Sequence, residues 1–183
     1  MRLYRQTVED FGLYTGMEMA GTEYEKLRCA AGAMSAKMRA VRIIAASNVS
    51  KGDLQQRLIR KGEDPEDAKN AVQWMTDMQL VDDRKTAEQV VGNCIRKGYG
   101  IARAKQALYE KRIPKQYWEE ALEDYPDQAD AILMFLKSRL QEDSDERDVK
   151  RAVDALLRRG HSYPQIRRGL ERLSLETDEF PED

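Results

Sequence analysis

The sequence predicts an all-α protein built from tandem three-helix repeats. Its 183 residues include 19 Ala and 16 Leu but only 9 Val, 8 Ile and 6 Thr. The first pair suits helices, whereas the second group favours strands. A helix-end pattern also recurs three times at nearly constant spacing, which is typical of repeat proteins. Because 35% of the residues are charged, the apolar material suits thin helical layers better than a sheet covered on both faces.

The repeated pattern is a leucine near a helix end, a cation within the next three residues and a proline soon afterwards. The prolines are Pro65, Pro114 and Pro164, which are separated by 49 and 50 residues. A cation in a last turn complements the negative end of the helix dipole, and Pro fits the first position of the next helix. The unit is therefore about 50 residues long, a length suited to three short helices.

Residues that start and stop helices support this assignment. Gly62 and Gly160 stand where the first and third copies end a helix, and Arg112 replaces glycine in the second copy. Glycine accepts the left-handed conformation that ends many helices. Asp64 is expected to cap the helix that begins at the following proline, and Ser50–Asp53 resembles a capping box.

Apolar stripes at helical spacing predict three helices in each repeat, about nine in all. Short helices are marginal alone, so we expect the units to stack into an elongated, curved arrangement. The predicted organisation is an N-terminal extension, three repeats and an acidic disordered tail, over residues 1–33, 34–80, 81–125, 126–175 and 176–183.

The two ends of the chain differ from its body. Net charge is −1 for residues 1–33, +4 for residues 34–175 and −5 for residues 176–183, so the C-terminal end is expected to be solvated. Between Gly21 and Gly32 the extension could hold one helix, around Tyr24 and Leu27. Residues 11–14 stand among glycines and are expected to form a short strand or arm.

Several classes of protein are disfavoured. The longest apolar run, Ala131–Leu136, is far shorter than the roughly 20 residues of a membrane span. Residues 1–10 are charged and no apolar block follows them, so we expect no secretory signal and a cytoplasmic location. Cys29 and Cys94 lie 65 residues apart, which favours two reduced, buried thiols over a disulfide framework or a cysteine zinc site.

No catalytic constellation stands out. His161 is the single histidine, and Ser162 beside it gives no Ser–His–acid geometry. The acidic pairs Asp82–Asp83 and Glu119–Glu120 suit helix starts and solvated faces better than a metal site. Residues 97–103 superficially suggest a phosphate-binding glycine turn, but an arginine stands three positions after Gly100 and no strand precedes it. We therefore expect no enzyme activity, no metal and no cofactor.

Cations form the most plausible functional surface, because they cluster at equivalent places in the repeats and could meet DNA phosphates or an acidic protein surface. Tyr99 joins them because it stands between cations in a glycine-rich turn. The contact candidates are Arg57, Arg60, Lys61, Arg96, Lys97, Tyr99, Arg103, Lys111, Arg112, Arg158, Arg159, Arg167, Arg168 and Arg172.

Over about residues 34–173 the sequence resembles the RecX family of bacterial RecA regulators. The resemblance rests on Ser50–Leu54 followed by Lys61–Gly62, on Leu80–Asp83, and on Lys97–Gly100 leading to Leu108 and Lys111. It implies an all-α protein of tandem three-helix repeats that binds the RecA nucleoprotein filament. The family usually inhibits recombinase and coprotease activity in DNA repair and the SOS response, without a cofactor of its own.

On this interpretation the chain is a non-enzymatic modulator of RecA, expected to be monomeric, with weak affinity for single- or double-stranded DNA. Two other classes stay open. One is an independent nucleic-acid-binding helical module, which a salt titration on bare DNA would reveal. The other is a helical protein-interaction scaffold unrelated to RecA, which affinity capture would reveal. A hydrolase ranks last, because no nucleophile, base and oxyanion donors converge.

Overall fold

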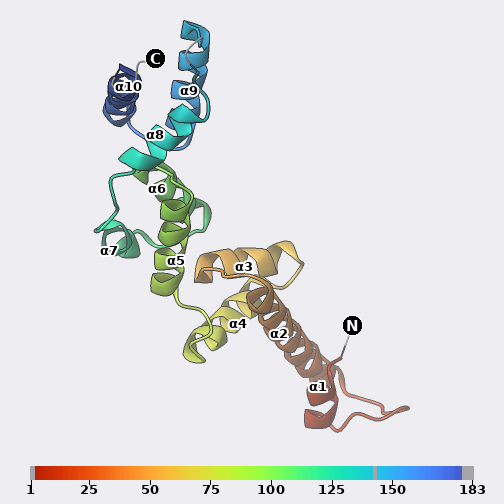
Figure 1. Ribbon diagram of the computed structural model, residues 1–183. Coiled ribbons are helices and arrows are strands. Elements are labelled where there is room, and N and C mark those ends of the chain that lie inside the picture. Colours follow the sequence, from red (N-terminus) through yellow and green to blue (C-terminus); the bar gives the residue numbers. More distant parts are fainter. Residues whose placement is uncertain (1–2, 142–143, 179–183) are drawn as a thin grey trace. The chain divides into compact units, whose positions relative to one another are not determined.

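The computed structural model describes residues 3–141 and 144–178, and this part of the chain contains helices and no strand (Figure 1). The predicted all-α fold class is confirmed. The elements, in order, are α1 (Arg5–Asp10), α2 (Gly21–Ala46), α3 (Lys51–Arg60), α4 (Pro65–Asp77), α5 (Asp83–Arg96), α6 (Ile101–Glu110), the 3₁₀ helix η1 (Lys115–Tyr117), α7 (Trp118–Leu122), α8 (Ala129–Lys137), α9 (Glu146–Arg158) and α10 (Tyr163–Asp178).

The chain divides into two compact units. The first unit contains Met1–Thr86 together with Lys111–Ile113, and the second unit contains Ala87–Glu110 together with Pro114–Asp183. Each unit has its own buried apolar residues. The boundaries predicted for the three sequence repeats stay predictions, and the compact units do not follow them.

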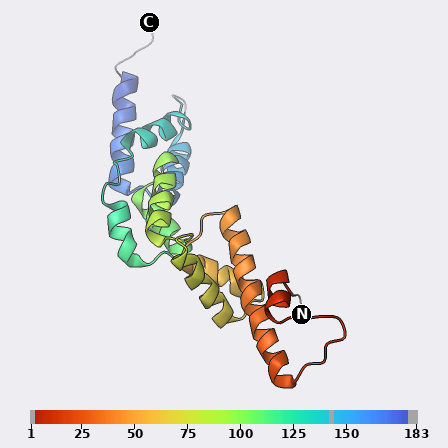
Figure 2. The ribbon, with the colours of Figure 1, turned by 90° about the horizontal axis from the view of Figure 1, so that it is seen from below.

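The N-terminal region differs from its prediction. Helix α2 is continuous over 26 residues and so joins the helix expected around Tyr24 and Leu27 to the first helix of the first repeat. Gly32 does not end this helix. A Cβ atom there would lie 2.5 Å from Oδ2 of Asp67 on α4, so the glycine allows a close side-chain approach. Residues 11 and 12 form a turn after α1 and residues 13 and 14 have no regular secondary structure, so the strand alternative was wrong and the arm stays a prediction. Figure 2 shows α1 lying beside α2.

Three helices form the core of the first unit. Helices α2, α3 and α4 pack on one another, and Leu54, Leu58 and Met75 between them are completely buried. Ala36 and Ala40 of α2 are also fully buried, and their small side chains bring the neighbouring helices close. Burial of these apolar side chains is the main source of stability for helices of this length.

The predicted helix caps are present. The Oγ atom of Ser50 accepts a hydrogen bond from the N–H of Asp53 at 3.0 Å, and Oδ1 of Asp64 accepts one from the N–H of Glu66 at 2.9 Å. Asp82 caps α5 in the same way, through the N–H of Arg84 at 2.9 Å. Each cap satisfies backbone donors that the first helical turn leaves without partners.

The three helix stops are equivalent in conformation. Gly62, Arg112 and Gly160 have φ angles of 88°, 54° and 87°. All three therefore lie in the left-handed region that glycine enters without strain. The expectation that Arg112 takes the place of glycine is confirmed, and it carries the steric cost of a Cβ atom in this conformation.

Residues Lys111–Ile113 pack within the first unit although they follow α6 in sequence. The buried hydroxyl of Ser50 donates a hydrogen bond to the carbonyl oxygen of Lys111. A Cβ atom at Gly52 would lie 3.2 Å from both Cβ and the carbonyl oxygen of Arg112. The start of α3 therefore contacts the end of the second helix-stop pattern directly.

The second unit contains α5 from Ala87 onward together with α6 to α10. Its C-terminal core contains Ile132, Leu136, Leu156 and Ile166, all completely buried. Gly169 of α10 permits close packing on α8, because a Cβ atom there would lie 2.6 Å from Cγ2 of Ile132.

The third helix expected in the second repeat is short, and consists of η1 and α7. Helical conformation is disfavoured for Tyr125, because proline follows it. Its hydroxyl instead donates a hydrogen bond to the carbonyl oxygen of Tyr99 at 2.6 Å.

Three sequence expectations concern single segments. Helix α10 continues to Asp178, three residues into the segment expected to be a disordered tail, and residues 179–183 lie outside the described residues. Cys94 is buried as expected, but Cys29 is exposed on α2, so that expectation was wrong. None of the helices in the described ranges is long and apolar enough to cross a membrane.

Candidate functional site

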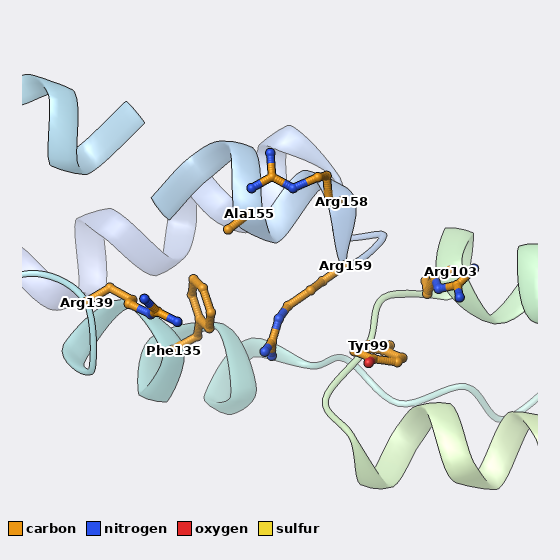
Figure 3. A pocket seen from close by; sticks show the side chains of 7 residues that line it. All are labelled: Tyr99, Arg103, Phe135, Arg139, Ala155, Arg158 and Arg159. Carbon is orange, nitrogen blue, oxygen red and sulfur yellow. The ribbon is translucent and has the colours of Figure 1, made fainter. Parts of the chain in front are cut away.

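The second unit contains a cavity of about 270 Å³ in which arginine side chains gather around two aromatic rings (Figure 3). We call it the arginine cavity. It is lined by Tyr99, Arg103, Phe135, Arg139, Ala155, Arg158 and Arg159.

Three separate segments supply these residues. Tyr99 stands in the turn between α5 and α6, and Arg103 lies on α6. Phe135 lies on α8 and Arg139 follows that helix, four residues later, so both point from the same side of the chain. Arg158–Arg159 end α9. The cations of the second and third sequence repeats therefore meet at one place.

A close contact between main-chain segments brings these elements together. The N–H of Gly100 donates a hydrogen bond to the carbonyl oxygen of Arg159 at 2.9 Å. A Cβ atom at Gly100 would collide with the carbonyl group of Gly160, and a Cβ atom at Gly160 would collide with the main chain of Arg103. Both positions therefore require glycine for this approach.

His161 strengthens the same contact. Its ring is buried, and its Nε2 atom lies 3.0 Å from the carbonyl oxygen of Gly98, which makes Nε2 the hydrogen-bond donor. Its Nδ1 atom is buried without a hydrogen-bond partner. Burial lowers the pKa of His161, an effect partly opposed by the hydrogen bond to Gly98. The neutral ring therefore acts as a packing and hydrogen-bonding group after the α9 stop.

Tyr125 holds the other side of the turn. Because its hydroxyl donates to the carbonyl oxygen of Tyr99, it fixes the main chain from which the Tyr99 ring projects. Burial raises the pKa of Tyr125 to about 12, so the phenol keeps its proton at neutral pH and remains a donor.

Aromatic rings orient two of the guanidinium groups. The guanidinium carbon of Arg159 lies 4.6 Å from the centroid of Phe135 and 5.9 Å from that of Tyr99. The guanidinium carbon of Arg139 lies 5.6 Å from the centroid of Phe135. These are cation–π distances, at which the ring attracts the positive charge without neutralising it.

The charge of the cavity is only partly neutralised. Arg103 forms an ion pair with Glu110 at 3.0 Å, and this hydrogen-bonded pairing raises the pKa of Arg103 and lowers that of Glu110. Within residues 3–141 and 144–178, no carboxylate pairs with Arg139, Arg158 or Arg159. The cavity therefore presents more positive charge than its surroundings cancel.

Four of the cation and tyrosine candidates lie in the cavity, namely Tyr99, Arg103, Arg158 and Arg159. Phe135 and Arg139 also line the cavity but were not among the candidates, although their four-residue spacing on one helical side was a usable signal. Whether any candidate contacts a partner stays a prediction. The candidates outside the cavity are Arg57, Arg60, Lys61, Arg96, Lys97, Lys111, Arg112, Arg167, Arg168 and Arg172.

Several of the outside candidates have partners within the protein. Arg57 contacts Asp53 at 2.9 Å, and Arg167 pairs with Glu171 at 2.9 Å. Arg172 pairs with a carboxylate on a different helix, that of Asp130, at 2.8 Å. The pairs of Arg167 and Arg172 are exposed and contribute little to stability, whereas Asp53 is buried. Each of the three pairs reduces the positive charge available to an outside ligand.

A metal centre finds no support in the described ranges, where no three His, Cys, Asp or Glu side chains are grouped as ligands. Positive charge and hydrogen-bond donors are what the arginine cavity offers. Its chemistry is therefore that of anion binding.

Comparisons of sequence and of structure with known proteins find RecX proteins. A family model described as the second three-helix domain of RecX matches residues 82–122. Regulatory protein RecX from Vibrio campbellii is 27% identical over 146 residues, covering 78% of this chain and 93% of that protein. Regulatory protein RecX from Halorhodospira halophila is 28% identical over 142 residues, covering 75% of this chain and 88% of that protein.

Solved structures show the same fold. A crystal structure of regulatory protein RecX superposes with a TM-score of 0.70 at 18% identity, covering 91% of this chain and 86% of that one. RecX from Lactobacillus salivarius superposes with a TM-score of 0.67 at 20% identity, covering 80% of this chain and 99% of that one. The solved structures support the helical fold, and the matched three-helix domain together with the curated relatives shows that this chain is similar to RecX proteins over most of their length.

Proposed function

We propose that this protein binds the RecA nucleoprotein filament and inhibits the recombinase and coprotease activities of RecA in DNA repair and the SOS response. The observation that carries the proposal is the similarity to regulatory RecX proteins over most of both chains. The arginine cavity supports it, because a filament of protein and DNA presents phosphates and acidic side chains to a positively charged surface.

Inhibition of this kind requires no chemical step. A ligand shifts an assembly equilibrium only by its difference in affinity for the two states. The protein would therefore inhibit by binding filament subunits more tightly in a state that cannot add further RecA or engage a second substrate. Repeated helical units favour such binding, since several modest contacts to one polymer multiply their effects when the geometry allows.

DNA-dependent ATP hydrolysis by RecA from the same organism tests the proposal. Stoichiometric addition of this protein should suppress the steady-state rate, and filament lengths measured by electron microscopy should shorten. Cleavage of a repressor substrate should fall in parallel. An unchanged hydrolysis rate at stoichiometric excess would contradict inhibition, and longer filaments would reverse its direction.

An independent nucleic-acid-binding module is the second candidate function, favoured by the three arginines without carboxylate partners in the described residues. Binding to bare DNA, without RecA, would then be tight at physiological salt and would weaken steeply as salt rises. Weak binding to bare DNA combined with strong binding to the RecA filament would favour the first candidate.

A further inference from the structure

We propose that the arginine cavity binds a backbone phosphate of a nucleic-acid strand. The inference deepens the proposed function and rests on it, because it identifies DNA as the part of the filament that contacts this cavity. The charge of the cavity, the orientation of its donors and the placement of its two rings support the inference, and all of these residues lie within the second unit.

The positive charge of the cavity is not balanced by carboxylates among the described residues, which favours binding of an external anion. Arg139, Arg158 and Arg159 line one small space without a carboxylate partner in those residues. Like charges gathered in this way repel one another, and a bound anion relieves that repulsion. Because Arg139 and Arg158 are exposed, a ligand can reach them without any change in the fold.

The donors are held in place before a ligand arrives. Figure 3 shows Phe135 between the side chains of Arg139 and Arg159, and both guanidinium groups lie within cation–π distance of its ring. The main-chain bond from Gly100 to Arg159 fixes the segment that carries the second of these arginines. Such fixed donors lose little freedom on binding, which favours affinity.

The number and directions of the donors favour a phosphate over a carboxylate. A guanidinium donates two parallel hydrogen bonds, and the lone pairs with which a carboxylate accepts them all lie in one plane. A phosphate is tetrahedral and can accept from several arginines arranged around it. Guanidinium groups from α9 and from the segment after α8 approach the cavity from different elements, which suits a tetrahedral anion.

The aromatic rings do not offer a platform for a nucleobase. The guanidinium groups of Arg139 and Arg159 lie against the Phe135 ring, and that of Arg159 also lies near the Tyr99 ring. Base stacking on exposed aromatic rings is a usual device of single-strand binding proteins. Here the rings contact arginine side chains instead. We therefore expect the cavity to contact the phosphate backbone, with no preference for base sequence.

Fluorescence anisotropy with a labelled single-stranded oligonucleotide, in the absence of RecA, tests the inference directly. Arg139→Ala and Arg158→Ala should each weaken binding about tenfold or more, since each removes a charged hydrogen-bond donor. Each should also reduce the slope of log affinity against log salt by about one. Arg139→Lys and Arg158→Lys should each give an intermediate loss of affinity, because the positive charge remains but the bidentate guanidinium does not.

Arg147→Ala is the matched control. Arg147 is an exposed arginine on α9, the helix that carries Arg158, and it does not line the cavity. Its removal changes the net charge equally and should change affinity by less than about twofold. Equal losses in Arg147→Ala and Arg158→Ala would overturn the inference, because binding would then depend on total charge alone. Helical circular dichroism should be unchanged in all three variants.

Nuclear magnetic resonance of the arginine Nε–H groups identifies the ligand chemistry. Titration with the oligonucleotide should shift the signals of Arg139, Arg158 and Arg159, whereas sodium chloride at equal ionic strength should not. Inorganic phosphate should shift the same signals at much higher concentration. Shifts with inorganic phosphate but none with the oligonucleotide would overturn the nucleic-acid source, and stronger shifts with polyglutamate would overturn the phosphate chemistry.

Parallel RecA assays separate this inference from the proposed function. If the wild-type protein inhibits RecA but the cavity variants bind bare DNA normally, the inference fails and the function stands. If the cavity variants lose DNA binding while the wild-type protein leaves RecA unaffected, the cavity assignment stands and the RecA proposal fails. Loss of both activities in the cavity variants, with both retained in Arg147→Ala, supports both.

Discussion

The N–H of Gly100 donates a hydrogen bond to the carbonyl oxygen of Arg159 at 2.9 Å, although 59 positions separate the two residues in the chain. The bond joins the turn that carries Tyr99 to the end of α9. It therefore aligns an aromatic ring and a guanidinium group that come from different sequence repeats, and the arginine cavity depends on this alignment.

Gly100→Ala should destabilise the second unit. The added methyl group would collide with the main chain of Gly160, which cannot rotate aside as a side chain does. We expect the free energy of unfolding to fall by about 1–3 kcal/mol, measured by urea denaturation. Gly92→Ala is the control, since its nearest neighbour would be the Arg96 side chain at 3.7 Å. Equal stability of the two variants would contradict a rigid contact at Gly100.

Arg112→Gly should stabilise the first unit. Arg112 holds a φ angle of 54° and is exposed, so glycine relieves left-handed strain without removing buried contacts. We expect a gain of about 1 kcal/mol in the free energy of unfolding. Gly62→Ala makes the reverse change at an equivalent stop, where φ is 88°, and should lose a similar amount. Destabilisation by Arg112→Gly would show that the arginine side chain contributes more than its backbone costs.

Ser50→Ala should destabilise the first unit by about 1–3 kcal/mol. The hydroxyl is completely buried, accepts from the N–H of Asp53 and donates to the carbonyl oxygen of Lys111. Its removal leaves both groups without a partner in a buried place. Ser138→Ala is the control, because that hydroxyl is exposed and bonds within its own helix end, so its loss should fall within about 0.5 kcal/mol. Urea denaturation of both variants measures the difference.

Acidification should weaken the second unit through His161. Its pKa is lowered in the folded state, mainly by burial and partly by the nearby charge of Arg159, while Asp127 and the Gly98 hydrogen bond act in the opposite direction. The folded protein thus binds fewer protons than the unfolded chain near pH 6. The contribution of His161 to stability is present above the unfolded pKa of about 6.5 and is lost as pH falls below it.

His161→Gln isolates this effect, because the chain has no other histidine. Thermal unfolding measured between about pH 7.5 and about pH 5.5 should show a larger loss of stability in the wild-type protein than in the variant. Carboxylates titrate in both proteins and cancel in the comparison. An identical pH dependence would contradict this prediction, because it would mean that the pKa of His161 is the same in the folded and unfolded proteins.

Local features of the sequence predicted the helix starts and stops. Asp64, Ser50 and Arg112 behave as expected because a cap or a left-handed stop depends on a few neighbouring residues. Gly32 was misleading for the opposite reason, since its role is to admit the side chain of Asp67 from another helix. A pattern along one helix contains no information about such an approach.

The candidate site was predictable only in part. Tyr99, Arg103, Arg158 and Arg159 were selected because they stand near helix ends, and the structure brings them to one cavity. Arg139 was missed because it belongs to no recurring pattern, and its importance comes from the ring of Phe135 beside it. Conversely, Arg172 was a candidate for contact with a partner, but its side chain pairs with Asp130, 42 positions away in the chain.

The placement of Lys111–Ile113 in the first unit affects how the protein can be divided for experiments. A fragment that stops at Thr86 would lack the carbonyl group that receives the Ser50 hydroxyl and the buried side chain of Ile113. Expression of the N-terminal half by itself would therefore leave the Ser50 hydroxyl, at the start of α3, without its main-chain acceptor. A stable N-terminal fragment should include Lys111–Ile113, either joined to Thr86 by a short linker or supplied with the rest of the chain as a separate polypeptide.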